Sequence, residues 1–125
     1  MNLGELEKSI LHYLWQYQPA DAKTVHAHFS DLRSSSLNTI QSALDRLYKK
    51  DLLTRQKQGH AFQYQTLQSK QEFVGQLMND VAADFISAEP DRLQAAFVTM
   101  TQHADEDTLA NLEKLIQQRR LQQNL

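Results

Sequence analysis

Apolar residues recur at helical spacing through the first part of the chain, at intervals of three or four. These positions are Leu3, Leu6, Ile10, Leu14 and Tyr17, with Leu11 widening the stripe. They predict a helix over about residues 3–17. The proline at position 19 disfavours helical backbone in the residue before it, so the helix is expected to end there.

A second, shorter helix is predicted over about residues 22–29. Asp21 is its expected N-cap, because a carboxylate accepts hydrogen bonds from the free amides of a first turn. Val25 and Phe29, four residues apart, are its expected inward side chains. The serine-rich stretch 30–35 is predicted to be a polar loop before a third helix capped by Ser35 or Ser36.

The third helix has the clearest division between an apolar and a polar face. At 100° per residue, one face collects the apolar residues Leu37, Ile40, Ala43, Leu44 and Leu47. The opposite face collects Asn38, Ser42, Asp45, Arg46 and Lys49, with Thr39 and Gln41 beside them. The first face is predicted to be core, and the second can hydrogen-bond base edges or phosphates.

A hairpin is predicted directly after this helix. Residues 52–57 read as a strand, Gln58 and Gly59 as a tight turn, and residues 60–66 as the return strand with Phe62 and Tyr64 on one side. Three helices followed by a hairpin are the element order of a winged helix-turn-helix domain. The predicted fold is therefore mainly α with a small two-stranded wing.

The rest of the chain is predicted to be three helices. Ser69 and Glu72 have the spacing of a capping box, Pro90 suits the first turn of the next helix, and the last helix covers about 105–121 before a polar tail expected to fray. Because so small a helical domain is marginal alone, it is expected to pair with a second copy. The predicted domains are residues 1–67 for DNA binding and 68–125 for dimerisation. The candidate dimerisation residues are Phe73, Leu77, Val81, Phe85, Leu93, Phe97, Met100, Leu109, Leu112 and Ile116.

Composition adds that the 125-residue chain has no cysteine and no apolar run near the ~18 residues that span a membrane. Its N-terminus carries acids and no small-residue cleavage site, so a cytoplasmic protein without a signal peptide is expected. The net charge of −2 is unevenly distributed. Residues 33–60 hold six Lys/Arg against two Asp/Glu, whereas residues 68–125 hold five against nine. The positive charge therefore lies on the third helix and the hairpin.

Catalytic and metal sites find little support in the sequence. The five histidines are His12, His26, His28, His60 and His103. They lack the spacing of three or four converging zinc ligands. No nucleophile elbow or phosphate-binding glycine loop occurs, and acids such as Glu5 and Glu7 at a helix start are explained by the helix dipole. We predict no enzyme activity, no cofactor and no metal.

A longer pattern joins the third helix to the hairpin. Thr39 to Arg55 reads T-I-x-x-x-L-D-R-L-x-K-K-x-L-L-T-R. With LGELEKSILHYLW and TVHAHF before it, and GHAFQYQ and EFVGQLMNDV after it, the chain resembles the penicillinase-repressor (BlaI/MecI/CopY) family nearly throughout. The resemblance implies a small bacterial homodimeric winged-helix repressor that binds a palindromic operator in double-stranded DNA.

The resemblance also makes the third helix the recognition helix and the hairpin a wing at the phosphates. Asn38, Gln41 and Ser42 are expected nearer the bases, Lys49, Lys50, Arg55 and Lys57 at phosphates, and Asp45 is expected to orient Arg46. The candidate DNA-binding residues are Ser36, Asn38, Thr39, Gln41, Ser42, Arg46, Lys49, Lys50, Arg55, Lys57 and His60.

Two departures leave the inducing signal open. The chain lacks the cysteine pairs of copper-responsive members and the Asn-Phe bond at which antibiotic-responsive members are cleaved, although a regulatory protease stays a candidate partner. Two alternatives also stay open. One is a protein–protein adaptor built on the same fold, and the other is a metal-responsive repressor that uses histidines.

Overall fold

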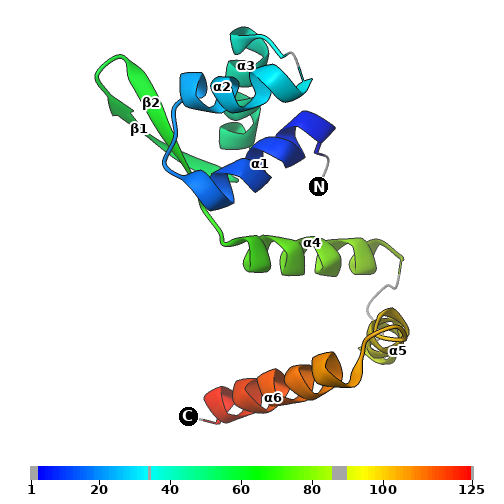
Figure 1. Cartoon of the computed structure of the whole chain (residues 1–125). Coiled ribbons are helices and arrows are strands. Elements are labelled where there is room, and N and C mark those ends of the chain that lie inside the picture. The colour runs from blue at the N-terminus through cyan, green and yellow to red at the C-terminus, as the bar shows by residue number, and fades with distance from the viewer. Residues whose placement is uncertain (1–2, 34, 86–89, 125) are drawn as a thin grey trace. The chain divides into compact units, whose positions relative to one another are not determined.

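The computed structural model describes residues 3–33, 35–85 and 90–124. Backbone contacts divide the chain into two compact units, Met1–Asp80 and Val81–Leu125. The first unit has the element order α1 (Glu5–Tyr17), α2 (Ala22–Arg33), α3 (Leu37–Lys49), β1 (Leu53–Gln58) and β2 (Ala61–Thr66), followed by most of α4 (Lys70–Phe85). Three helices and a two-stranded antiparallel hairpin make the winged helix-turn-helix that the sequence predicts (Figure 1).

The helix starts follow the predicted capping chemistry. The Asp21 carboxylate accepts a hydrogen bond from the Thr24 amide at 2.8 Å, and the Ser36 hydroxyl accepts one from the Thr39 amide at 3.1 Å. The predicted loop over 30–35 is wrong in its first part, because α2 continues to Arg33. The Ser30 hydroxyl donates to the Ala27 carbonyl at 3.1 Å, so this serine is accommodated within the helix.

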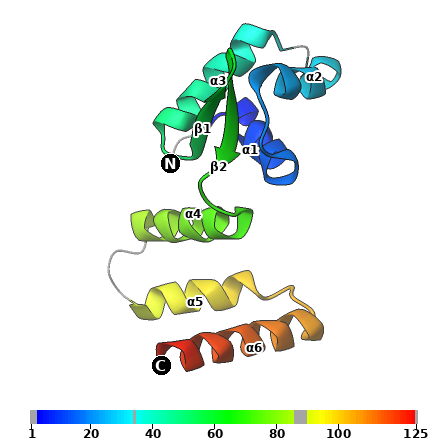
Figure 2. The ribbon, with the colours of Figure 1, turned by 90° about the vertical axis from the view of Figure 1, so that its left-hand side faces the viewer.

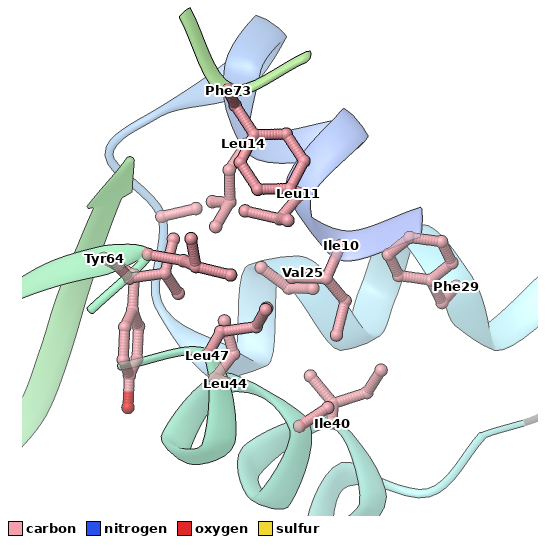
Figure 3. Packing of buried hydrophobic residues seen from close by; sticks show 14 residues of the cluster. Ile10, Leu11, Leu14, Val25, Phe29, Ile40, Leu44, Leu47, Tyr64 and Phe73 are labelled. Atoms are coloured by element: carbon pink, nitrogen blue, oxygen red, sulfur yellow. The ribbon is translucent and has the colours of Figure 1, made fainter. Parts of the chain in front are cut away.

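One apolar cluster fills the space between the three helices and the base of the wing (Figure 3). The predicted inward face of α3 is confirmed by Ile40, Ala43, Leu44 and Leu47, which are fully buried. Tyr17 departs from the prediction because 60% of it is exposed. Its ring lies instead beside that of Tyr13 at 5.2 Å, on the outside of the last turn of α1.

The wing is a regular hairpin whose turn differs from the prediction. Gln58 pairs with Ala61, so Gly59 and His60, not Gln58 and Gly59, form the two-residue turn. Gly59 has φ +63°, and glycine at the first turn position suits a type II′ hairpin turn. On the other edge, Ala20 pairs with Tyr64 through two backbone hydrogen bonds, which fixes the base of β2 to the α1–α2 connection.

The start of α4 belongs to the winged unit. Phe73 is only 8% exposed and lies in the apolar cluster, on the side of Leu11 and Leu14 in Figure 3. Its ring centroid is 5.5 Å from that of Trp15, whose indole N–H donates to the Gln68 carbonyl at 3.1 Å. Leu77 packs against the same cluster.

Two of the predicted dimerisation residues, Phe73 and Leu77, make these contacts, and their role in a dimer stays a prediction. Their apolar side chains are used within one chain, because the short 67–69 connection places the first turns of α4 over Trp15. The compact unit consequently extends to Asp80, beyond the domain boundary predicted at residue 67. The capping box that starts α4 is present, although the Glu72 carboxylate accepts from the Ser69 hydroxyl at 3.0 Å where the pattern predicts the Ser69 amide.

The second unit contains α5 (Pro90–Met100) and α6 (Glu106–Gln123). Asp105 caps α6 by accepting from the Thr108 amide at 2.8 Å, and the helix includes most of the tail that was predicted to fray. Many apolar side chains of this unit are exposed, and α6 has no buried residue. The exposed ones include Val81, Leu93, Phe97, Val98, Met100, Leu115, Ile116 and Leu121. Within the described ranges, none of the helices has the length and hydropathy of a membrane span.

Candidate nucleic-acid interface

The polar face of α3 is uncharged along its first half and exposed. Asn38, Thr39, Gln41 and Ser42 all lie at the surface, as predicted from their position opposite the buried face. The Ser36 and Thr39 hydroxyls are 2.8 Å apart, so a second hydrogen bond joins the capping residue to the first turn of the helix. This face therefore offers amides and hydroxyls, the groups that donate to and accept from base edges.

The C-terminal end of α3 is basic and sharply terminated. The Leu52 amide donates to the Leu47 carbonyl and the Asp51 amide to the Tyr48 carbonyl, which is the Schellman arrangement. Asp51 has φ +62°, the left-handed conformation that this arrangement requires. The turn leads the chain directly from α3 into β1, which runs beside α3 (Figure 2).

Glu7 of α1 forms ion pairs with two of the cations that were predicted to contact DNA. It is 6% exposed, and its carboxylate lies 2.7 Å from Lys50 Nζ and 3.5 Å from Arg46 Nε. Burial alone would raise the pKa of Glu7, but the hydrogen bond and charge of Lys50, with a smaller contribution from Arg46, lower it below its ordinary value. The half-exposed Arg46 is therefore tied to α1 as well as displayed at the surface.

Glu7 was missed as a site residue because its position was explained by the helix dipole alone. A signal was present in the sequence. Glu7 is four residues after Leu3 and three before Ile10, so it falls on the apolar stripe of α1. An acid on a buried stripe requires a partner cation, although only the fold identifies it as Lys50.

Asp45 does not orient Arg46, contrary to the prediction. Its carboxylate lies 3.0 Å from Lys49 Nζ and 3.3 Å from Arg55 Nη1. Arg46, one residue further around the helix, faces α1 and Glu7 instead. The hydrogen bond from Lys49, with the nearby Arg55 charge, lowers the pKa of Asp45 below its ordinary value.

The Arg55 side chain reaches from β1 of the wing to α3. Its side chain is 25% exposed, with the guanidinium carbon 4.0 Å from the Tyr48 ring centroid and 4.2 Å from that of Phe62. Lys57 and His60, closer to the tip of the wing, are exposed. The predicted basic wing is therefore divided into one half-buried cation and an outer group that faces solvent.

His60 lies at the turn of the wing, and His28 lies on α2. The His28 ring centroid is 4.5 Å from that of Tyr13, with the rings tilted, and 4.8 Å from that of Phe29, edge to face. In the part of the chain that the structure describes, no three His, Cys, Asp or Glu side chains gather in a way that could hold a metal ion.

The family model described as penicillinase repressor matches residues 3–118, which span both units. The chain belongs to the penicillinase repressor family. Within known proteins it is similar to the transcriptional regulator BlaI of Mycobacterium tuberculosis strains CDC 1551 and H37Rv, with 28% identity over 115 residues in each. That alignment covers 91% of this penicillinase-repressor chain and 82% of the BlaI chains.

Solved structures give the same assignment for the winged unit. The solution structure of the DNA binding domain of the repressor BlaI is 26% identical, with a TM-score of 0.51, and the alignment covers 55% of this chain and 84% of that domain. RosR of H. salinarum, at 14% identity and a TM-score of 0.52, covers 82% of this chain and 96% of its own. At that identity, RosR supports the fold alone.

Proposed function

We propose that the protein is a homodimeric transcriptional repressor that binds a palindromic operator in double-stranded DNA through α3 and the wing. Each protomer would place α3 in the major groove of one half-site, and the dimer would set half-sites about one helical turn, or a multiple of it, apart. Repression would follow from occlusion of a promoter. Release would require separation of the protomers, or cleavage within residues 68–125 by a regulatory protease.

The observation that carries this proposal is the division of α3 into a buried face and an exposed, capped polar face inside a winged unit. Asn38, Gln41 and Ser42 project from the exposed face at helical spacing, beside the basic end of the helix. The likeness to the DNA binding domain of the repressor BlaI supports placing this face against DNA.

Dimerisation is supported by the apolar side chains of the second unit. Leu93, Phe97 and Ile116 each have between 43% and 49% of their surface exposed, and Leu109 and Leu112 are half-buried. The side chain of Phe85, another predicted dimerisation residue, lies outside the described part of the chain. Apolar residues repeated along two helices are expected to be covered by the same helices of a second copy.

The test is DNA footprinting with the purified protein on the region upstream of its own gene, at two salt concentrations. We expect protection of an inverted repeat, with affinity that falls as salt rises because phosphate contacts release counterions. Replacing Gln41 with alanine should weaken binding to the repeat, by about 1–3 kcal/mol per lost base contact, while binding to unrelated DNA changes little.

The matched control is Gln71→Ala, which removes an equally exposed glutamine from α4. It should leave the footprint unchanged. Weak binding without a protected repeat, equal for both variants, would reject the DNA-binding proposal and favour the adaptor alternative. Loss of the footprint on adding zinc or copper would instead favour metal-responsive regulation.

A further inference from the structure

We infer that Arg55 is a positioning residue that clamps the wing to the recognition helix, rather than a phosphate contact. The inference rests on the proposed DNA binding for its consequence, although the clamp itself exists in the free protein. It assigns the same role to three residues that the sequence did not single out for it: Asp45 and Tyr48 of α3, and Phe62 of β2.

The geometry joins three elements at one guanidinium group. Asp45 and Tyr48 are three residues apart, so they share one face of α3. Arg55 reaches that face from β1, with Nη1 at 3.3 Å from the Asp45 carboxylate. Phe62 lies on β2, diagonally across the hairpin from Arg55. Its ring centroid is 4.2 Å from the guanidinium carbon.

The stacking explains two exposed aromatic rings. Tyr48 and Phe62 are 37% and 38% exposed, so each ring is largely covered on one side. Each ring faces the Arg55 guanidinium, which also donates a hydrogen bond to the Asp45 carboxylate. Arginine can make both contacts at once because its charged group is planar, whereas the ammonium group of lysine is not.

The backbone attachments of the wing to the rest of the unit extend no further toward the tip than Arg55. The Leu67 amide donates to the Leu52 carbonyl, and Tyr64, which is directly opposite Arg55, pairs with Ala20. In the described part of the chain, no backbone hydrogen bond from outside the hairpin reaches the residues between that pair and Gly59. A two-stranded hairpin is at best marginally stable alone. Arg55 lies midway along β1, so it fixes the distance between the outer wing cation Lys57 and the polar face of α3.

The sharpest test is Asp45→Ala, because the two explanations predict opposite signs. If Arg55 and Lys49 simply contact phosphates, removing Asp45 frees both cations and removes a repulsive charge, so DNA affinity rises. If Arg55 is a clamp, the wing loosens and affinity falls, by up to about five-fold for an ion pair at this exposure. Arg55→Lys keeps the charge and should weaken binding in the same way, whereas a phosphate contact would tolerate lysine.

The second measurement uses the free protein and does not depend on DNA. Amide hydrogen exchange over 53–66 should accelerate in Asp45→Ala, Arg55→Lys and Phe62→Leu. Lys57→Met, which removes a cation from the same strand and the same side of the hairpin, is the control. It should leave exchange unchanged. The slope of log K for DNA binding against log salt concentration should become shallower by about 0.9 per lost phosphate contact.

Unchanged exchange in Arg55→Lys, or tighter DNA binding by Asp45→Ala, would overturn the inference. Additive effects of Asp45→Ala and Phe62→Leu on affinity would also count against it, because residues of one clamp should show coupled losses. If wild-type protein fails to bind DNA while the exchange results hold, the proposed function fails and the clamp stands.

Discussion

At the residue scale, the molecule contains a buried acid whose charge is balanced by cations from another element. The Glu7 carboxylate pairs with Arg46 and Lys50, two cations that the sequence analysis predicted to contact DNA. Both lie at the C-terminal end of α3. An ionised carboxylate at this position stabilises the fold only while both the charge and its partners are present. The contact between α1 and the C-terminal end of α3 is therefore expected to weaken when Glu7 is protonated.

The first prediction is a loss of stability in acid that involves Glu7. Its folded-state pKa lies below the ordinary value of 4.5, so the native state releases a proton that the unfolded state retains. The stabilisation is complete above pH 4.5 and declines as the pH falls through the lower folded-state value. Urea unfolding followed by Trp15 fluorescence should show a smaller decline below pH 4.5 in Glu7→Gln than in wild type.

Glu5→Gln is the matched control, because Glu5 lies on the same turn and pairs with Lys8 in an exposed contact. Exposed pairs contribute about 0–1 kcal/mol, so this variant should follow the wild-type curve. A Glu7→Gln curve that also follows wild type would show that Lys50 and Arg46 do not stabilise the folded carboxylate.

The second prediction concerns two left-handed residues, Asp51 and Gly59. Asp51→Gly should raise the free energy of unfolding by about 0.5 kcal/mol, because it removes a cost of about 1 kcal/mol for a side chain at positive φ and adds a smaller entropic cost. Gly59→Ala should lower it by about 1 kcal/mol through the same conformational cost. Thermal unfolding measures both, with Asp51→Asn as the control that keeps a residue tolerant of positive φ.

At the element scale, α4 serves two compact units in succession. Its first turns are bound to the winged unit through Phe73, Leu77 and Trp15, and its last turn from Val81 onward is grouped with the second unit. The helix is thus a direct structural connection between the unit proposed to bind DNA and the unit proposed to dimerise. Its N-terminal half contributes to the stability of the winged domain whether or not a second copy is bound.

The third prediction separates these two roles of α4. A chain of residues 1–80 should fold, and a chain of residues 1–67 should be less stable by about 3–5 kcal/mol, the usual cost of losing a buried phenylalanine. Phe73→Ala in the 1–80 chain should reproduce most of that loss, whereas Val74→Ala, which truncates an exposed side chain of the same helix, should cost little. Equal stability of the 1–80 and 1–67 chains would return Phe73 to the dimerisation surface.

At the scale of the whole molecule, the apolar surface of α5 and α6 is larger than a small helical unit can bury by itself. None of the residues described in 91–124 is buried, although the two helices carry leucine, valine, isoleucine, methionine and phenylalanine at helical spacing. Small domains that leave so much apolar surface exposed gain stability by association. The stability of this unit is accordingly expected to depend on protein concentration.

The fourth prediction tests the dimer directly. Phe97→Glu should weaken self-association by about thirtyfold or more, because removal of a large apolar side chain from an interface centre typically costs 2 kcal/mol or more. Sedimentation equilibrium measures the change. Gln94→Glu, which adds the same charge at another exposed position of α5, is the control and should leave self-association largely intact.

The sequence alone determined the winged helix-turn-helix order, the buried face of α3 and its polar opposite. These features depend on periodicity and capping, which are local properties of the chain: Ser36 caps α3 because it precedes a helical run, and Ile40 is buried because Leu44 and Leu47 share its stripe. The family pattern from Thr39 to Arg55 was likewise readable in one contiguous segment.

The tertiary structure decided which charges are paired. Glu7 meets Lys50 across 43 positions of sequence, Arg55 meets Asp45 and Phe62 from three different elements, and Phe73 fills a space next to Trp15. No periodicity within one element encodes these contacts, because they depend on how α1, α3, the wing and α4 pack against one another. A basic residue near α3 can therefore be identified from sequence, but only the fold separates a cation paired with a carboxylate of the protein from one that faces solvent.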